Sequence, residues 1–269
     1  MINMRRDCNE KQKKHNALNL NKAVCQQRVE ACLDLENLLV HNIKLGVLRA
    51  ASAIPGSIGD QAETRFLRRK RTAAGAAAVD SFEALLNELT PTSLCLDLGA
   101  NVGEFTEKLA AKAGHVHAFE PDPWTFERLK ERVGSLPNVT LHQAAIGVKD
   151  GTIALRRPPE FATDPEQASV GCSIVAGVDD NWSTVEVKVV DFSAFVESLN
   201  RTVDIVKMDI EGAEVDVLEH FLESPLRDTV GAMFVETHEV NMPELRDRIS
   251  KLRRSVSALR KPVINLDWP

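Results

Sequence analysis

The sequence has 269 residues, 43% of them apolar and 27% charged, which is enough apolar chain for one large α/β domain with a buried core. Its net charge of −6 argues against a protein that binds nucleic acid through overall positive charge, so we expect no nucleic-acid partner.

The five cysteines are scattered along the chain and include no C-x-x-C pair. This pattern is typical of reduced thiols in a cytoplasm rather than of disulfides or a zinc site. No stretch approaches the roughly 20 apolar residues that a membrane-spanning helix needs, and the N-terminus lacks the apolar segment of a signal peptide. We therefore expect a cytoplasmic protein with no membrane span.

Residues 1–78 are expected to form an N-terminal helical extension. Residues 1–15 are polar and basic and are predicted to be disordered. An irregular apolar stripe predicts a helix over 18–40, and the breaker-rich stretch 53–59 is interpreted as a linker. The basic run RFLRRKR, 65–71, is interpreted as a solvated helix face, with a contact to an anionic substrate or membrane surface as the alternative.

Helical and strand periodicities alternate after this extension. Asp80 and Glu83 resemble a capping box, and apolar residues at helical spacing predict a helix over 80–89. The alternation that follows is typical of a parallel sheet with crossover helices. Strands are predicted at 94–98, 115–119, 139–143, 151–156, 185–190, 203–210, 232–237 and in the C-terminal PVINLDWP, and helices at 104–113, 123–133, 192–199, 213–222 and around Leu245, Ile249 and Leu252.

The stretch LCLDLGANVGEF, 94–105, joins a strand to a helix through a turn that contains two glycines. Gly99 and Gly103 permit close approach of backbone to a ligand at the carboxyl end of the strand, where open α/β sheets bind ligands. A pyrophosphate would use G-x-G-x-x-G and the helix N-terminus, but the spacing here is G-x-N-x-G. The Asn101 side chain can donate and accept hydrogen bonds, which suits an amino acid's carboxylate and amine, and Asp97 could hold a cationic group nearby.

A carboxylate follows the second strand. Glu120, in AFEPD, lies 21 positions after Gly99 and is placed to accept hydrogen bonds from two ribose hydroxyls, while it would repel a 2′-phosphate. Gln143, after the third strand, could reach an adenine edge, and Ala144 would leave room for the ring. A nucleoside joined to an amino acid without a diphosphate is S-adenosylmethionine, which these residues favour as the cofactor.

The motifs DLGANVGEFT, FEPDP, AAIG and KMDIEGAE occur in this order and at typical distances. Together they resemble the FkbM-type methyltransferases, within the S-adenosylmethionine-dependent class I enzymes that have a Rossmann-like sheet. The resemblance covers about residues 80–240 and implies a three-layer α/β domain over 79–269. It also implies a seven-stranded, mostly parallel sheet with an antiparallel last strand, and methyl transfer to a hydroxyl of a sugar or related metabolite.

The resemblance further implies which residues surround the cofactor. Phe105 would pack beside the methionine end, Glu120 would hold the ribose, and Asp122 would border the adenosine. The full set of cofactor-binding residues is predicted to be Asp97, Gly99, Asn101, Gly103, Phe105, Glu120, Asp122, Gln143 and Ala144.

KMDIEGAE and FVETHE supply the predicted catalytic residues, because the resemblance places this region beside the reactive methyl. The base that assists the acceptor hydroxyl must lie within hydrogen-bond reach of it. By their positions at strand ends we rank Asp209 and His238 above Glu211, with Glu236 as a weaker candidate.

Each of these three catalytic candidates has a structural alternative. Asp209 could cap the following helix, Glu211 could favour its N-terminus through the helix dipole, and His238 could be a hydrogen-bonded structural histidine. The three could instead hold a divalent metal. Their spacing is not diagnostic of a metal site, and we predict none.

An O-methyltransferase is the leading hypothesis for function, with a small-molecule or glycan acceptor. An NAD-dependent oxidoreductase would share the glycine turn and the ribose-binding acid. This sequence lacks the G-x-G-x-x-G motif of such enzymes, which argues against that hypothesis. A non-catalytic module would bind a partner through the N-terminal helix and 65–71. N-methylation is disfavoured because N-P-P-Y is absent. The loop 157–184 is a candidate lid or acceptor wall. The N-terminal helix either covers the active site or makes a homodimer contact, and the residues favour neither.

Overall fold

The structure, a computed structural model, describes residues 45, 49, 57–169, 172 and 181–269. They belong to two compact units that divide between Lys70 and Arg71. In the first unit the Arg49 guanidinium lies 5.5 Å from the centre of the Phe66 ring. The second unit contains both sheets. The disorder and the helix predicted before residue 41 lie outside the described residues.

Helix α2 runs from Ser57 to Glu88 and so begins well before the predicted start at residue 80. Asp80 therefore lies inside the helix, and the predicted capping box is wrong. The helix continues because TAAGAAA is dominated by alanine, the strongest helix former, and no proline interrupts it. The basic run 65–71 and the last three residues of the expected linker are also part of α2.

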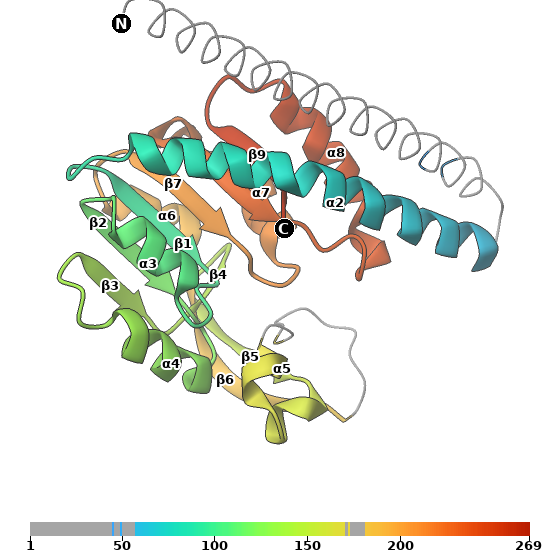
Figure 1. Cartoon of the computed structure of the whole chain (residues 1–269), viewed down its shortest axis with the longest axis horizontal. Helices are drawn as coiled ribbons and strands as arrows, with labels where there is room; N and C mark the ends of the chain where they lie inside the picture. The colour runs from blue at the N-terminus through green and yellow to red at the C-terminus, as the bar shows by residue number, and fades with distance from the viewer. Residues whose placement is uncertain (1–44, 46–48, 50–56, 170–171, 173–180) are drawn as a thin grey trace, which may run out of the picture. The chain divides into compact units, whose positions relative to one another are not determined.

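The larger sheet has six strands in the order β3-β2-β1-β7-β8-β9, and every neighbouring pair is parallel (Figure 1). Parallel neighbours require crossover connections, which the helices between the strands supply. The strands are β1 (Leu94–Leu98), β2 (His115–Phe119), β3 (Val139–His142), β7 (Val203–Met208), β8 (Val230–Glu236) and β9 (Val263–Trp268). The helices are α3 (Glu104–Ala110), α4 (Pro123–Val133), α6 (Phe192–Ser198), α7 (Glu214–Glu223) and α8 (Arg246–Ser257).

Helices cover both faces of this sheet, as predicted for a three-layer α/β domain. Successive side chains of a strand point to opposite faces. Leu96 and Leu98 of β1 therefore pack in the core that α6, α7 and α8 cover, whereas Cys95 packs in the core that α2 and α3 cover. Helix α4 adds Leu129 and Val133 to a third cluster, with Ala118 of β2.

The expected seven strands with an antiparallel last strand are wrong for the described residues. The sheet has six strands, and β9 is parallel to β8. The reason is the connection between them: α8 crosses one face of the sheet and returns the chain to the same end, which produces a parallel neighbour. An antiparallel neighbour would need a hairpin-like return.

A second, three-stranded sheet has the order β4-β6-β5. The sequence predicted β5 (Gly151–Arg157) and β6 (Ser183–Asp191), but not β4 (Ala145–Gly147). Three residues are too short to show a period, which explains the omission. The expected loop 157–184 contains two short helical segments, η1 (Pro159–Ala162) and α5 (Pro165–Ala168). Figure 1 shows α5 next to β5, with β6 alongside.

The order of the larger sheet reverses at β1, whose neighbours are β2 and β7. Ligands of open α/β sheets bind outside the carboxyl ends of the strands at such a point. The turns after β1, β2 and β7 lie at this point. Among the described residues, no helix combines the length and apolarity needed to cross a membrane.

Candidate active site

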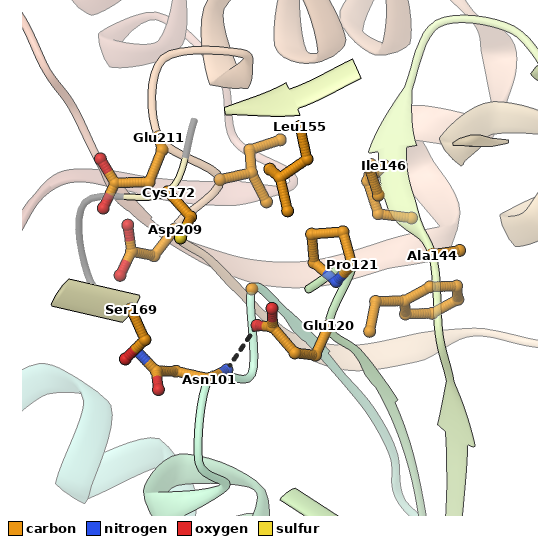
Figure 2. Close-up of a pocket in the computed structure, with 14 residues that line it drawn as sticks. Asn101, Glu120, Pro121, Ala144, Ile146, Leu155, Ser169, Cys172, Asp209 and Glu211 are labelled. Atoms are coloured by element: carbon orange, nitrogen blue, oxygen red, sulfur yellow. Dashed lines mark hydrogen bonds between the residues drawn. The ribbon is translucent and has the colours of Figure 1, made fainter. Parts of the chain in front are cut away.

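A pocket opens at the carboxyl ends of β1, β2 and β7 and encloses about 640 Å³, including its open mouth. Gly99 and Asn101 line it from the turn after β1, and Glu120 from the turn after β2. Asp209 and Glu211 line it from the turn after β7 (Figure 2). The apolar part of the lining consists of Phe119, Pro121, Ala144, Ala145, Ile146, Leu155 and Ile210, and Ser169 and Cys172 complete it.

The glycine turn is shaped by the close approach of β7. Gly99 has φ +74°, and a Cβ there would lie 1.7 Å from the carbonyl oxygen of Asp209, so no other residue fits. Asn101 also has positive φ, at 48°. The backbone N–H groups of Gly99 and Ala100 both donate to the carbonyl of Phe119, which fixes the turn against the end of β2.

Glu120 is held by backbone donors from both sides. Its Oε2 accepts from the N–H of Asn101 at 3.0 Å (Figure 2). Its Oε1 accepts from the N–H of Asp122 at 2.9 Å. Only 7% of Glu120 is exposed. Burial raises the pKa of Glu120 to about 7, against the opposing effect of the two backbone hydrogen bonds. Each oxygen keeps one free lone pair for a ligand in the pocket.

The turn after β7 is organised by Glu214, at the start of α7. Its Oε1 accepts from the N–H of Ile210 at 2.8 Å, and its Oε2 accepts from the N–H of Gly212 at 2.9 Å. Between these anchors Glu211 takes φ +55°, which a residue with a side chain rarely adopts. The buried Glu214 thus forces a turn that directs Glu211 toward the pocket.

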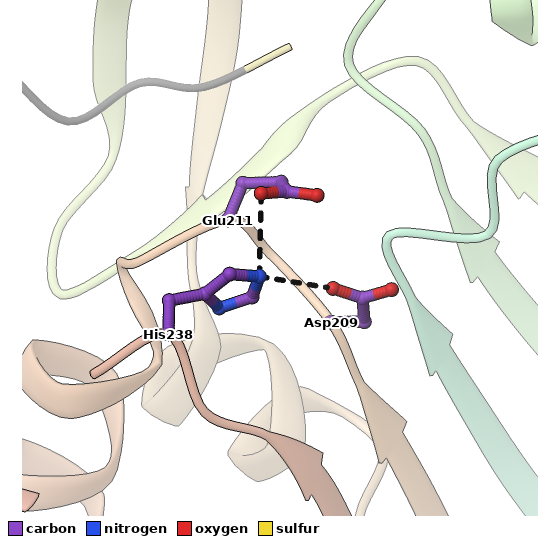
Figure 3. A group of neighbouring side chains, drawn as sticks. All are labelled: Asp209, Glu211 and His238. Atoms are coloured by element: carbon purple, nitrogen blue, oxygen red, sulfur yellow. Dashed lines mark ion pairs between the residues drawn. The ribbon is translucent and has the colours of Figure 1, made fainter. Parts of the chain in front are cut away.

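His238 follows β8 and lies among three carboxylates, two of which, Asp209 and Glu211, are drawn in Figure 3. Its Nε2 is 3.2 Å from Glu211 Oε2 and 3.8 Å from Asp209 Oδ1, and its Nδ1 is 3.2 Å from Glu214 Oε1. Burial lowers the pKa of His238, but the hydrogen bonds with Glu211 and Glu214 outweigh it and raise the pKa to about 10. Burial also raises the pKa of Glu211, which the contact with His238 partly offsets. His238 therefore carries a proton at neutral pH in the protein alone, which does not fit the expected role of base.

Four of the nine predicted cofactor residues line the pocket: Gly99, Asn101, Glu120 and Ala144. The three predicted catalytic residues come together, with Asp209 and Glu211 in the lining and His238 behind them. The remaining five cofactor residues, Asp97, Gly103, Phe105, Asp122 and Gln143, do not line this pocket.

Three of these five, Asp97, Gly103 and Phe105, lie in β1, α3 and the turn that joins them. Asp97 is fully buried and accepts a hydrogen bond from Thr106 Oγ1 at 2.6 Å, and burial raises its pKa. Gly103 is the N-cap of α3, where a Cβ would lie 2.8 Å from Leu129 Cδ1 of α4. Phe105 packs against aromatic rings of the core and borders a second, open depression, which shares Asn101 and Asp209 with the pocket.

The other two, Asp122 and Gln143, follow β2 and β3. Asp122 caps α4, accepting from the N–H groups of Trp124 and Thr125, and its Oδ2 lies 2.5 Å from Arg157 Nε. The cap confirms the predicted helix start. Gln143 is exposed.

Lys207 was not predicted as a site residue. It is the one charged side chain that β7 buries, and it lies next to the glycine turn after β1. Its Nζ donates to the carbonyl oxygen of Gly99 at 2.7 Å. It also lies 3.6 Å from Asp97 Oδ1 and 3.7 Å from Asp209 Oδ2. A lysine between the apolar residues Val206 and Met208 of VDIVKM was the available signal, because a buried lysine needs charged partners.

The chain is similar to several curated methyltransferases. It is 32% identical over 143 residues to "Methyltransferase 1" of Beauveria bassiana, covering 47% of this chain and 57% of that protein. It is 27% identical over 161 residues to "Hexuronic acid methyltransferase AglP" of Haloferax volcanii, covering 59% and 62%. It is 28% identical over 141 residues to "2-O-methyltransferase NoeI" of Sinorhizobium fredii, covering 48% and 57%. The matches thus span about three fifths of the length of these relatives.

The family described as "Methyltransferase FkbM domain" matches residues 97–259, more than half of the chain. The match begins at the buried Asp97, and it includes the glycine turn, Glu120, the turn after β7 and His238. The resemblance stated from the motifs is confirmed, and an NAD-dependent oxidoreductase is set aside. The chain belongs to the FkbM methyltransferase family.

Proposed function

We propose that the protein is an S-adenosylmethionine-dependent O-methyltransferase that acts on a hydroxyl of a sugar or related metabolite. The observation that carries this proposal is the shared pocket. Glu120 lines it from one side of the strand-order reversal, and Asp209 and Glu211 line it from the other. A nucleoside-binding carboxylate and candidate proton acceptors thus face the same space.

The side formed by Glu120 suits the nucleoside part of the cofactor. Its two oxygens are fixed by backbone donors, and each can accept one further hydrogen bond from a ribose hydroxyl. Next to it, Ala144, Ile146 and Leu155 provide an apolar wall suited to the face of an adenine ring. The turn after β1 has the spacing G-x-N-x-G and not the G-x-G-x-x-G that cradles a diphosphate.

The side formed by Asp209 and Glu211 suits the acceptor. In the transfer, the acceptor oxygen bonds to the methyl carbon while the carbon–sulfur bond breaks, leaving neutral S-adenosylhomocysteine. The proton of the hydroxyl must go to a base within reach. We assign this role to Asp209, which lines the pocket and has a side chain that is 28% exposed. His238, already protonated in the protein alone, positions the carboxylates and is a positioning residue.

A sugar acceptor is supported by one relative, which is named for hexuronic acid, and O-methylation by another, which is named a 2-O-methyltransferase. They are similar to this chain over 161 and 141 residues. Sugars present several hydroxyl groups, and a pocket wall with two carboxylates offers matching acceptors for them.

The test is to incubate the purified chain with isotopically labelled S-adenosylmethionine and a panel of saccharides and cell extracts. We expect the label in a product that has gained one CH₂ unit, identified by mass spectrometry as a sugar ether. Transfer to a nitrogen would contradict the proposed O-methylation. Cofactor binding without transfer to any acceptor would instead support a non-catalytic module.

A further inference from the structure

Asp209, Glu211 and His238 have the geometry of a metal site. One ligand atom from each lies within 4.8 Å of the others. His238 Nε2 is 3.2 Å from Glu211 Oε2 and 3.8 Å from Asp209 Oδ1 (Figure 3). Neighbouring ligands of one octahedral ion, each about 2.1 Å from it, lie about 3 Å apart. The three atoms therefore need only small shifts to share one ion.

The histidine is buried and its ring is oriented from behind. Only 5% of His238 is exposed, and its Nε2 points toward the two carboxylates. Its Nδ1 lies 3.2 Å from the carboxylate of Glu214, which is 1% exposed and fixed by two backbone N–H groups. Metal-binding histidines are commonly held in this way, with one nitrogen facing a carboxylate and the other facing the ion.

The charges around the histidine also favour a cation. Three carboxylates surround one imidazole, and Asp209 Oδ1 is buried without a hydrogen bond from the described residues. The nearby Lys207 balances them only in part, because its Nζ lies 3.7 Å from Asp209 Oδ2 and is shared with Asp97 and the carbonyl of Gly99. Buried carboxylates are costly unless they are paired or coordinate a metal.

We propose that Asp209, Glu211 and His238 bind one divalent metal ion at the wall of the pocket, with Glu214 orienting His238. The two carboxylate oxygens and one imidazole nitrogen suit Mn²⁺ or a similar first-row ion, and they leave coordination positions open toward the pocket. This reverses the prediction from sequence, which had no means of showing that the three side chains meet. A metal bound by Nε2 takes the place of the proton there, so His238 then binds as neutral imidazole.

The role of the ion rests on the proposed function. In an O-methyltransferase it would bind the acceptor hydroxyl and favour its deprotonation, orienting the oxygen toward the methyl. Asp209 would bind the ion through Oδ1 and would accept the hydroxyl proton through Oδ2, so its role as base is unchanged. The binding of the ion itself does not depend on this role and can be measured without cofactor or acceptor.

The experiment titrates Mn²⁺ into the chelator-treated, desalted full-length chain and follows free Mn²⁺ by electron paramagnetic resonance. We expect one ion per chain. Replacing the orienting group, Glu214→Gln, should weaken binding about 10- to 100-fold, and His238→Gln should weaken it at least as much. His220→Gln is the matched control, because His220 lies on α7 and is exposed. It should leave Mn²⁺ binding unchanged.

Circular dichroism must show that each variant keeps the wild-type fold. If His238→Gln does not fold, Glu211→Gln replaces it, since this side chain is 28% exposed. Wild-type protein that binds no Mn²⁺, or an equal loss in the His220 control, would overturn the proposal. Isothermal titration of the metal-free chain with S-adenosylmethionine tests the proposed function separately from the proposed metal site. Cofactor binding without Mn²⁺ binding overturns the metal site alone, whereas Mn²⁺ binding without cofactor binding overturns the proposed function and leaves the site.

Discussion

The two sides of the pocket are built in different ways. On the side that we propose for the nucleoside, Glu120 is fixed by backbone N–H groups of the turns after β1 and β2. On the side that we propose for the acceptor, Asp209, Glu211 and His238 are fixed largely by one another and by Glu214. Backbone support tolerates little change in chain geometry. Side-chain support depends on charge and can accommodate an ion or substrate.

The largest expected effect comes from adding a methyl group where the two sides meet. In Gly99→Ala the new Cβ would overlap the carbonyl oxygen of Asp209, and the residue would keep a positive φ. We expect the free energy of unfolding to fall by about 3 kcal/mol or more, with loss of cofactor binding. Urea denaturation followed by circular dichroism measures this change.

The matched control is Gly151→Ala in β5, where nothing lies within 4 Å of the new Cβ. It should change the stability by less than about 1 kcal/mol. Equal losses of stability in Gly99→Ala and Gly151→Ala would contradict the close contact between Gly99 and the carbonyl oxygen of Asp209.

The next effect is the dependence of stability on pH that Glu120 causes. Its pKa in the folded protein is about 7, above the ordinary value of 4.5. Burial thus favours the protonated form. The contribution of Glu120 to the free energy of unfolding is fully present below pH 4.5 and is lost as the pH rises through 7. The loss is on the order of 3 kcal/mol for such a shift in a buried carboxyl.

Glu120→Gln should remove this dependence, so that the difference in unfolding free energy between wild type and variant changes over pH 4.5–8. Denaturant unfolding at several pH values measures it. A constant difference across this range would mean that Glu120 is charged throughout and that burial does not govern it.

The contrast between the two sides also explains what the sequence could show. Gly99, Asn101 and Glu120 could be placed because each follows a strand closely in a contiguous motif, and adjacent parallel strands end at the same edge. Lys207 and Glu214 could not be assigned roles, although they stand in the same motif as Asp209. Their partners, Gly99 and His238, come from other strands, and only the register between β1, β7 and β8 brings them together.

The fold shows the same division. Helix α4 was predicted with its bounds, because Asp122 and Pro123 are strong local signals of a helix start. The second sheet was missed as a unit, since β4 has three residues and its pairing with β6 is a long-range property. The direction of β9 was also wrong, because the resemblance supplied it and no local pattern did.

The smallest expected effect concerns the Arg157–Asp122 ion pair, which links β5 to the N-terminus of α4. Arg157→Met should lower the unfolding free energy by about 1 kcal/mol, because the arginine is 22% exposed and Asp122 keeps its backbone donors. Thermal denaturation measures it. Lys130→Met, which removes an exposed pair on α4, is the control and should have a smaller effect. A larger loss of stability in Lys130→Met than in Arg157→Met would show that the Arg157–Asp122 ion pair contributes little to stability.

The most direct test of the central claim is the affinity for S-adenosylmethionine, measured by isothermal titration calorimetry. We predict one cofactor per chain. Glu120→Ala should bind about 10- to 100-fold more weakly, as expected for lost charge-assisted hydrogen bonds to the ribose. Glu127→Ala, an exposed acid on α4, should bind like wild type. Folded wild-type protein that binds no S-adenosylmethionine, or equal affinities for wild type and Glu120→Ala, would contradict the account.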